Sequence, residues 1–492
     1  MKLNKIILIT SALLLGAVAY AEDFDSFGDF GDFGDDSSSA GLSSKLEVNG
    51  SAEVELRAYV DTSNKDNKDG ADKIDVKALP NANLDLKYNG NKSDMDLNLR
   101  IDEDTIKNHP IDVIDEAVLR GRLGDYFTLE AGKMKLVWGK GDKLHVLDNF
   151  NADNYADFII PDYLDRRIST PMIRGLVSLP FANLNIEGVY TPLLPVDRFA
   201  TSGRWTPAQV TKLTASVTSL AKSSLESAMA SGLPANQLML YLANANNLSS
   251  NPDILYPDLW TLKYGQFGGR ATWTIGQVDM GISYYNGWYK QPSLNALKVK
   301  SFLAGYLADG KALESRKFLA YDKKQTFGLE ASTIIWHFNV RGEFAYNLTD
   351  DIDGTNLWVH NNSIAWLAGV DIDLPFWNAN LNVQETGTYI LNGDKCNITS
   401  YDVDYSANGY TNNKIVCNLT ASFLNDKIKP DITVMYGIEN KDLVLMPKLD
   451  FKADQNLTFT ASGMYIWCGD NNSEFKAWEK NSFVSLVAAY QF

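Results

Sequence analysis

The feature that most constrains this chain is an alternation of apolar and polar residues with a period of two. In the run at residues 46–60, Val48, Val54 and Leu56 share one parity, and glutamate, asparagine, serine and arginine occupy the other. A second run at residues 93–102 alternates methionine, leucine and isoleucine with aspartate, asparagine and arginine. Because successive side chains of a strand point to opposite faces, such runs predict strands with one apolar and one charged face.

Runs of this kind recur about eighteen times along the chain. They are residues 46–60, 82–88, 93–102, 113–123, 127–138, 171–179, 184–191, 262–275, 279–289, 325–335, 338–347, 362–373, 379–390, 413–424, 429–438, 442–452, 456–467 and 483–492. Every second connection is short, and most of the others are long. This asymmetry, with an even strand number, is typical of a bacterial outer-membrane barrel. The prediction for residues 45–492 is therefore an all-β, transmembrane, antiparallel up-and-down β-barrel with both termini in the periplasm; a soluble sandwich or propeller is the alternative.

The N-terminal residues indicate export. Two lysines and an apolar run over residues 6–18 precede the small-residue site Ala19-Tyr20-Ala21, which predicts a signal peptide over residues 1–21, cleaved after Ala21. Residues 22–44 repeat Phe-Gly-Asp three times before a serine run, and this composition predicts a flexible acidic segment. The alternative roles of that segment are contact with a periplasmic partner and occlusion of a pore.

The last run carries a second mark of the same fold. Leu486, Ala488, Tyr490 and the terminal Phe492 share one parity. This strand resembles the C-terminal recognition strand of porin-like outer-membrane barrels, which ends in phenylalanine behind alternating apolar residues. The resemblance implies that barrel-assembly machinery reads this strand. Aromatic residues near run ends, such as Tyr59 and Trp138, are expected in the girdles at the membrane interfaces.

A long connection at residues 139–170 is rich in aspartate and arginine. A Trp-Gly-x-x-Asp pattern begins at Trp138, and an Asp-x-x-Asn pattern begins at Asp148. These patterns resemble a stretch in a family of large bacterial outer-membrane barrels whose function is largely unassigned. The chain departs from that family at Ala152, where a proline commonly follows the asparagine.

Charged residues near this connection predict a constriction. Irregular backbone is tolerated at membrane depth where it lines a water-filled cavity, so the connection either enters the lumen or remains an outer loop. Inside the lumen, its carboxylates would face arginines of the wall and select solutes by charge. Alternatively, and without excluding the first arrangement, the arginines pair with wall acids such as Glu53, Glu55, Asp96 and Glu116. The candidate pore residues are Arg57, Arg100, Arg120, Arg122, Arg174, Asp142, Asp148, Asp153 and Asp165.

The insertion at residues 191–261 is expected to be an extracellular loop that carries helices. Thr206-Pro207-Ala208-Gln209 reads as a capping box with proline at the first helical position, followed by apolar residues at helical spacing to about Ala230. A second helix is expected over residues 236–246. The pair either packs on itself or caps the barrel mouth, with a ligand-gripping lid as a further alternative.

Metal sites, nucleic-acid binding and catalysis are disfavoured. The 61 acidic and 45 basic residues give a net charge of −16, unlike the basic surfaces that bind phosphate backbones. When Gly70 of the acidic loop 61–81 is aligned with the required glycine of a calcium-binding loop, Lys65 falls at the first ligand position. The loop therefore does not have the ligand spacing of a calcium site. The four histidines and three cysteines match neither zinc-ligand spacing nor a nucleophile motif. A disulfide among Cys396, Cys417 and Cys468 is permitted by export, with its pairing left open.

The predicted function is that of an outer-membrane, porin-like channel for passive passage of small hydrophilic solutes, without enzymatic activity or cofactors. A transporter of apolar substrates with an obstructed lumen and a surface adhesin or binding barrel are the alternatives. The clearest runs have a polar inner parity, which favours the channel over the transporter. Expected partners are outer-membrane lipid, the assembly machinery and small solutes, with no nucleic acid; a homotrimer is one option for the assembly.

Overall fold

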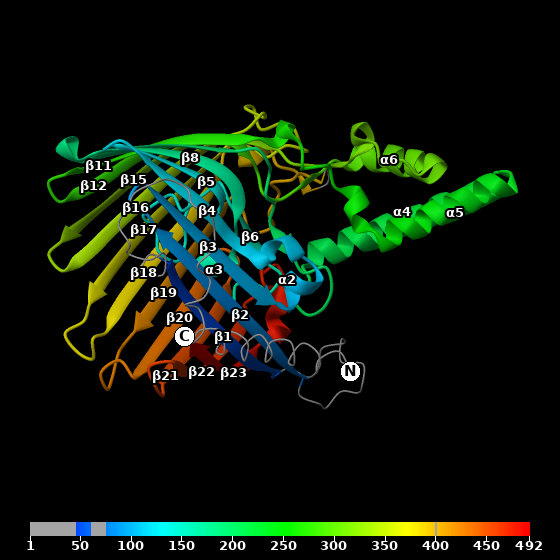
Figure 1. Ribbon diagram of the computed structural model, residues 1–492. Helices are drawn as coiled ribbons and strands as arrows, with labels where there is room; N and C mark the ends of the chain where they lie inside the picture. The colour runs from blue at the N-terminus through cyan, green and yellow to red at the C-terminus, as the bar shows by residue number, and fades with distance from the viewer. Residues whose placement is uncertain (1–45, 61–74, 399–400) are drawn as a thin grey trace, which may run out of the picture.

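A computed structural model describes residues 46–60, 75–398 and 401–492 (Figure 1). The expected signal peptide and acidic segment, at residues 1–44, lie outside these described residues. Eighteen antiparallel strands form one sheet, and β1 pairs with both β2 and β23, which closes the sheet into a barrel. No helix in the described part of the chain is long and apolar enough to cross a membrane.

Each of the eighteen predicted runs is a strand of this barrel, which confirms the predicted fold class. The strands are β1 (Leu46–Tyr59), β2 (Asp75–Asn89), β3 (Ser93–Asp102), β4 (Ile114–Leu123), β5 (Phe127–Met134), β8 (Thr170–Leu179), β9 (Leu184–Thr191), β11 (Gln266–Ile275), β12 (Val278–Trp288), β15 (Lys323–Ile335), β16 (Phe338–Leu348), β17 (Ser363–Asp373), β18 (Asn380–Ile390), β19 (Thr411–Thr420), β20 (Ile428–Gly437), β21 (Asp442–Lys452), β22 (Leu457–Cys468) and β23 (Phe483–Gln491). The largest difference is at β2, which begins at Asp75 rather than at residue 82. It pairs with β1 as far as Tyr59, so the preceding connection is shorter than expected.

The two faces of the sheet differ as the period-two pattern predicts. Directly opposed residues share a face, and the positions exposed on the outside are apolar: Val54, Leu56, Phe344 and Tyr465 are examples. The register also places Glu385 on this outer face, opposite the exposed Ala368. Of the charged outward residues in the described strands, Asp115, Lys133 and Lys323 stand within two residues of a strand end, whereas Glu385 is the sixth residue of the eleven-residue β18.

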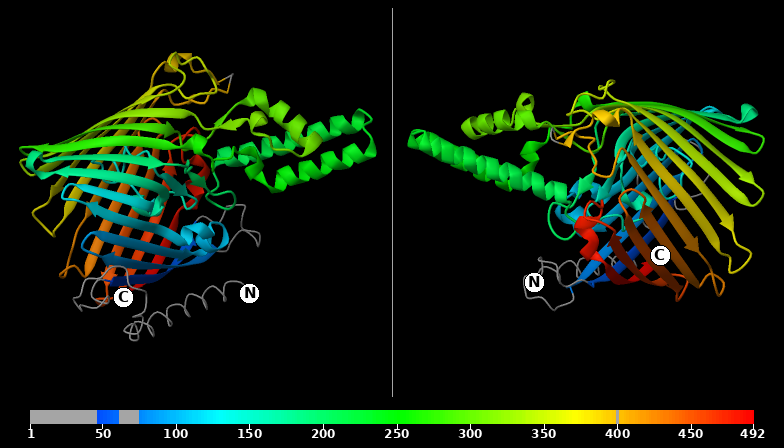
Figure 2. Two further views of the ribbon diagram at one scale, coloured as in Figure 1. Left: turned by 45° about the horizontal axis from the view of Figure 1, so that its top comes forward. Right: turned by 180° about the vertical axis from the view of Figure 1, so that it is seen from behind.

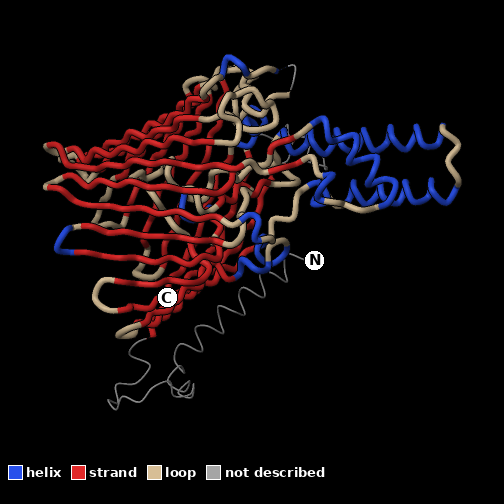
Figure 3. Tube along the Cα trace, turned by 90° about the horizontal axis from the view of Figure 1, so that it is seen from above, coloured by secondary structure: helices blue, strands red, loops and turns tan. Residues whose placement is uncertain are grey.

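The insertion forms an arm rather than a cap. Helices α4 (Ala208–Ala230) and α5 (Ala235–Ser250) lie side by side and extend away from the strand ends (Figures 1 and 2). A third helix, α6 (Ala296–Asp309), packs at the base of the arm, where Val217 and Leu248 meet Phe302 in a buried cluster. All helices of this arm gather at one end of the barrel (Figure 3). The expectation that the pair packs on itself agrees with these contacts.

The start of the arm differs from the predicted capping box. Helix α4 begins at Ala208, with Pro207 as the N-cap residue and no side-chain cap hydrogen bond. Thr206 stands one residue too early to cap, and its hydroxyl instead donates to the carbonyl of Gly203 at 3.1 Å. Two expected girdle residues are also elsewhere: Tyr59 and Trp138 are each 1% exposed and pack inside the barrel. Tyr59 stands on the inward parity of β1, and Trp138 follows the end of β5.

Candidate functional site: a lumen charge ladder and an inserted loop

Charged side chains of alternating sign cross the inner wall from β4 to β15. Arg120 donates to Glu130 at 2.6 Å, and Arg174 contacts Glu130 at 3.1 Å and Glu187 at 2.6 Å. Arg270 then contacts Glu187 at 3.4 Å and also pairs with Glu330. We call these six residues, Arg120, Glu130, Arg174, Glu187, Arg270 and Glu330, the charge ladder.

The register of the strands produces this ladder. Arg120 is directly opposite Glu130, Glu130 is opposite Arg174, and Glu187 is opposite Arg270. Opposite charges at such cross-strand positions attract and stabilise the pairing. The last pair of the ladder joins Arg270 of β11 to Glu330 of β15, with β12 between them. This pair can form because β12 carries Gly281 beside Glu330. A Cβ atom at Gly281 would lie 2.7 Å from Oε1 of Glu330, so the missing side chain is what lets the carboxylate reach across.

The connection from β5 to β8, residues 135–169, enters the lumen. Its anchor is Glu343 of β16, whose side chain is 0% exposed. One carboxylate oxygen accepts the backbone N–H groups of Lys140 at 2.7 Å and Gly141 at 2.6 Å; the other accepts those of Val146 at 2.9 Å and Leu147 at 3.3 Å. A carboxylate in a dry site requires such donors, so this clamp both satisfies Glu343 and fixes the loop.

Further wall residues hold the same loop on other sides of the barrel. Gln384 of β18 accepts backbone N–H groups of Lys143 at 3.1 Å and Leu144 at 3.3 Å. From β15, the ammonium group of Lys324 donates to the Asn149 side chain at 2.6 Å. The loop therefore reaches strands far from its own in the sheet, and of its two expected placements the structure shows the one inside the lumen.

The five arginines singled out from the sequence pair mostly with carboxylates of the barrel wall. Arg57 pairs with Glu55 at 2.8 Å and, from the loop, Asp157 at 2.7 Å. Burial raises the pKa of the Asp157 carboxyl, although the nearby guanidinium opposes that rise. Arg100 pairs with Asp102 at 2.8 Å and donates to the backbone carbonyl of Asp165 at 3.1 Å. Arg120 and Arg174 belong to the ladder, and Arg122 pairs with Asp94.

The four loop carboxylates expected opposite these arginines have other partners. Asp148 pairs with Arg167 of the same loop at 2.6 Å, and Asp153 lies 4.0 Å from that guanidinium. Asp142 accepts from the Asn382 amide at 3.1 Å. The carboxylate of Asp165 forms no ion pair with any of the described arginines, because its backbone carbonyl makes the contact instead. Thus the loop and the arginines share the lumen, but the structure does not pair them as the sequence suggested.

Two apolar clusters seat the loop against the wall at the arm end of the barrel. In one, Phe150 packs edge-to-face on Trp138 and Tyr285, with ring centroids 5.0 and 5.2 Å apart. In the other, Phe158 stacks on Trp205 at 5.2 Å, beside Tyr59. These clusters fill part of the lumen with side chains, so any solute path runs alongside the loop.

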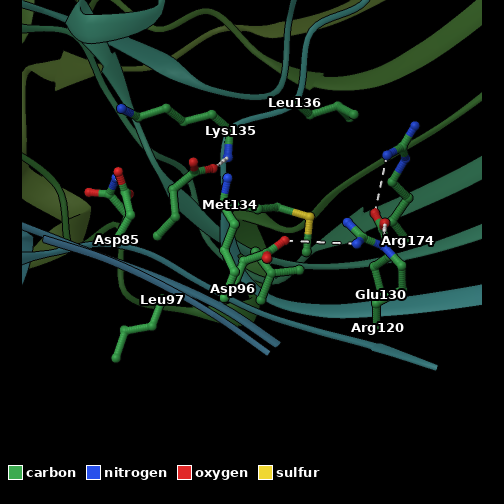
Figure 4. A pocket seen from close by; sticks show the side chains of 13 residues that line it. Asp85, Asp96, Leu97, Arg120, Glu130, Met134, Lys135, Leu136 and Arg174 are labelled. Carbon is green, nitrogen blue, oxygen red and sulfur yellow. Dashed lines mark hydrogen bonds and ion pairs between the residues drawn. The ribbon is translucent and has the colours of Figure 1, made fainter. Parts of the chain in front are cut away.

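A cavity of about 390 Å³ remains between the loop start and the wall of β2, β3, β4, β5 and β8 (Figure 4). Its lining combines acids, bases and three buried apolar side chains. The lining residues are Asp85, Lys87, Asp96, Leu97, Asn98, Glu116, Val118, Arg120, Glu130, Met134, Lys135, Leu136 and Arg174.

The three cysteines take no part in this arrangement. Cys396, Cys417 and Cys468 are all free thiols in the structure, so the permitted disulfide is not formed. Within the ranges that the structure describes, no group of three or more histidine, cysteine, aspartate or glutamate side chains is arranged to hold a metal ion.

Sequence reasoning missed Arg270, Glu330, Glu343 and Gln384. Arg270 and Glu330 lie on the polar parity of their strands, so the same signal that marked Arg120 was present at both positions. The loop anchors share this polar parity, but nothing local indicates that they bind the loop, because Glu343 and Lys140 are about 200 residues apart in the chain.

The closed antiparallel barrel, apolar outside and charged inside, is a porin-like β-barrel. The chain is similar to solved porins at low identity: a BenF-like porin from Pseudomonas fluorescens Pf-5 (9% identity, 91% of this chain and 98% of that chain, TM-score 0.46) and Pseudomonas aeruginosa OpdQ (8%, 91% and 97%, TM-score 0.44). Salmonella typhi OmpF, solved in complex with daunomycin, matches at 8% identity over 91% of this chain and 97% of that chain, with a TM-score of 0.38. No protein-family model and no curated protein matches the sequence.

Proposed function

We propose that the chain is an outer-membrane channel through which small hydrophilic solutes pass passively. The observation that carries this proposal is the charge ladder, because it lines the inner wall with ionised side chains, and two of its guanidinium groups, Arg120 and Arg174, remain 33% and 24% exposed to the lumen. The apolar outer face supports insertion in lipid, with the arm at the extracellular end. Assembly through the terminal strand and association as a homotrimer belong to the same proposal.

Single-channel conductance in a planar bilayer tests the channel. We expect stepwise ion conductance from the purified, folded barrel, and a larger conductance after deletion of residues 142–165, since that segment occupies the lumen. The matched control shortens the arm between Ser223 and Met239, which should leave conductance unchanged because the arm projects away from the mouth. A barrel that folds yet never conducts would contradict the proposal.

The orientation is tested separately by labelling. A cysteine introduced at Ser223 of the arm should react with an impermeant reagent on intact cells, whereas one at Asn91, in the turn between β2 and β3, should be protected. The opposite pattern would place the arm in the periplasm.

The apolar clusters favour a second candidate, a transporter of apolar substrates whose lumen is obstructed. Eleven buried residues, Phe150 and Trp138 among them, form one such cluster inside the barrel. The conductance measurement separates the two candidates, because an obstructed lumen passes no steady ion current while a porin does.

A further inference from the structure

A loose ion pair, Asp96 and Arg120, lies in the cavity between the loop and the wall. This inference rests on the proposed function, because it takes the cavity as part of the solute path. The nearest atoms of Asp96 and Arg120 are 3.8 Å apart, beyond hydrogen-bond distance. Their side chains are 36% and 33% exposed, so both are open to a solute. Arg120 donates from its Nε to Glu130, and one terminal nitrogen lies 3.7 Å from Asp94. Its terminal nitrogens make no hydrogen bond among the described residues.

The acidic side of this pair is reinforced by two wall carboxylates that lack a lysine or arginine partner in the described structure. Asp85 accepts from the amide of Asn98, and Glu116 accepts the backbone N–H of Lys135 at 2.7 Å. The ammonium group of Lys135 pairs instead with Asp115, at 2.7 Å. The cavity therefore offers a cation-binding side next to a guanidinium with free donors.

The rest of the lining consists of Lys87, which lies directly opposite Asp96 in the sheet, Leu97, the ladder residues Glu130 and Arg174, and three buried apolar side chains. Val118, Met134 and Leu136 are 9%, 5% and 4% exposed and belong to the cluster that seats the loop. Val118 lies directly opposite Asp96 in the sheet, so the apolar surface adjoins the charged pair. Figure 4 shows the Met134 side chain beside Asp96, and Leu136 farther along the cavity, beyond Lys135.

We infer that this cavity binds a zwitterionic solute with a compact apolar side chain, such as a neutral α-amino acid. The carboxylate of the solute would take the free nitrogens of Arg120, and its ammonium group would take Asp96. The apolar side chain would lie along Met134 and Leu136. A solute with only a negative charge, bound at Arg120, would meet the negative charge of Asp96. A solute with only a positive charge, bound at Asp96, would meet the positive charge of Arg120. Both like-charge contacts disfavour solutes that carry a single charge.

The test measures block of the ionic current through the wild-type channel at neutral pH by three probes with one carbon skeleton. They are L-leucine, isoamylamine, which lacks the carboxylate, and isocaproate, which lacks the ammonium group. We expect leucine to block half of the current at a concentration about tenfold lower than either analogue, the effect of one charge-assisted hydrogen bond. Glycine should require more than leucine, because it leaves the apolar surface uncovered.

Variants assign the two ends of the solute. Arg120→Gln should raise the half-blocking concentration of leucine about tenfold and leave that of isoamylamine no higher. Asp96→Asn should also raise the half-blocking concentration of leucine about tenfold and leave that of isocaproate no higher. Arg120→Lys keeps the charge but lacks the planar fork, so its effect should be intermediate. The control is Lys448→Gln, a lumen-facing substitution outside the cavity that should change none of these values.

The outcomes separate this inference from the proposed function. If the channel conducts but leucine blocks no better than either analogue, the inference is wrong and the channel stands. If the folded barrel does not conduct, both fail. If the variants do not fold, the comparison of the four probes on the wild-type channel still decides, since it needs no substitution.

Discussion

A single missing side chain lets the charge ladder cross a strand. Gly281 leaves the space through which Glu330 reaches Arg270, and both of these side chains are largely buried, at 1% and 14% exposure. A carboxylate turned away from its partner at such a site would be left uncompensated, which is costly in a low-dielectric environment.

Gly281→Ala should therefore destabilise the barrel by about 1–3 kcal/mol, the cost of breaking a buried charge-assisted contact. The control is Gly188→Ala on the outer face, where a Cβ would meet no atom within 4 Å. The stability of both variants is measured by urea unfolding, with loss of the heat-modifiable form as the readout. If the two variants were equally stable, Glu330 would still form its ion pair with Arg270 despite the added methyl group at position 281.

At the scale of elements, the strands were predictable because a period of two survives in each run. The lumen and lipid faces impose that alternation on every strand, so local sequence carries it. The helix α6 was missed although Val299, Phe302, Leu303 and Tyr306 stand at helical spacing and Gly310 ends it in the left-handed conformation. Its signal was present but lay within a connection interpreted as a loop.

The loop anchors lay beyond sequence reasoning for a different reason. Glu343 and Gln384 are ordinary inward polar residues of their strands, and nothing local distinguishes them from Asn382 or Asn418. Their role depends on a loop that arrives from the other side of the barrel. The candidate arginines could be placed on the lumen face from parity alone, but their partners depended on register, which the sequence leaves unspecified.

Glu343→Gln should loosen the loop. The amide offers one acceptor oxygen where the carboxylate offers two, and its NH₂ group would face the N–H groups of Val146 or Leu147. We expect trypsin to cleave after Lys140 or Lys143 about tenfold faster in folded protein, which corresponds to about 1.4 kcal/mol of easier local opening. Cleavage as slow as in the wild type would mean that Gln384 and the apolar clusters alone hold the loop.

For the whole molecule, the outer surface carries one anomaly. Glu385 stands in the middle of β18 on the lipid-facing parity, where its two oxygens accept the indole N–H of Trp366 at 3.0 and 3.2 Å. A charge at such depth is unfavourable in hydrocarbon, and the cost falls only where protein or water covers it.

If β17 and β18 face lipid, Glu385→Gln should stabilise the barrel by about 1 kcal/mol, because it removes the charge and keeps an acceptor for Trp366. Thermal loss of the heat-modifiable band, with Lys323→Gln at the rim as the control, reports the change. A less stable barrel, or a smaller assembly on native gels, would instead indicate that this face packs against another protein subunit.

Phe492 contributes to the seam that closes the barrel. The backbone of Phe492 exchanges hydrogen bonds with Gly50, at 2.9 and 3.0 Å, across the seam between β1 and β23. The ring of Phe492 occupies the space that a Cβ of Gly50 would fill, since its nearest atom would be only 2.3 Å away. Ring and glycine thus form one complementary contact at this seam, and recognition of the terminal strand by the assembly machinery stays a prediction.

Two substitutions therefore test the same contact from both sides. Phe492→Ala keeps the backbone hydrogen bonds but removes the ring, and Gly50→Val expels the ring by its bulk. Each should lower the stability of the closed barrel by about 1–3 kcal/mol, through lost packing in one case and overpacking in the other.

Combining Gly50→Ala with Phe492→Ala should recover part of the loss caused by Gly50→Ala alone, because the added methyl group then enters the space left by the ring. The heat-modifiable fraction after refolding measures each variant, and strictly additive losses would show that the ring and Gly50 do not act as a pair in closing the barrel.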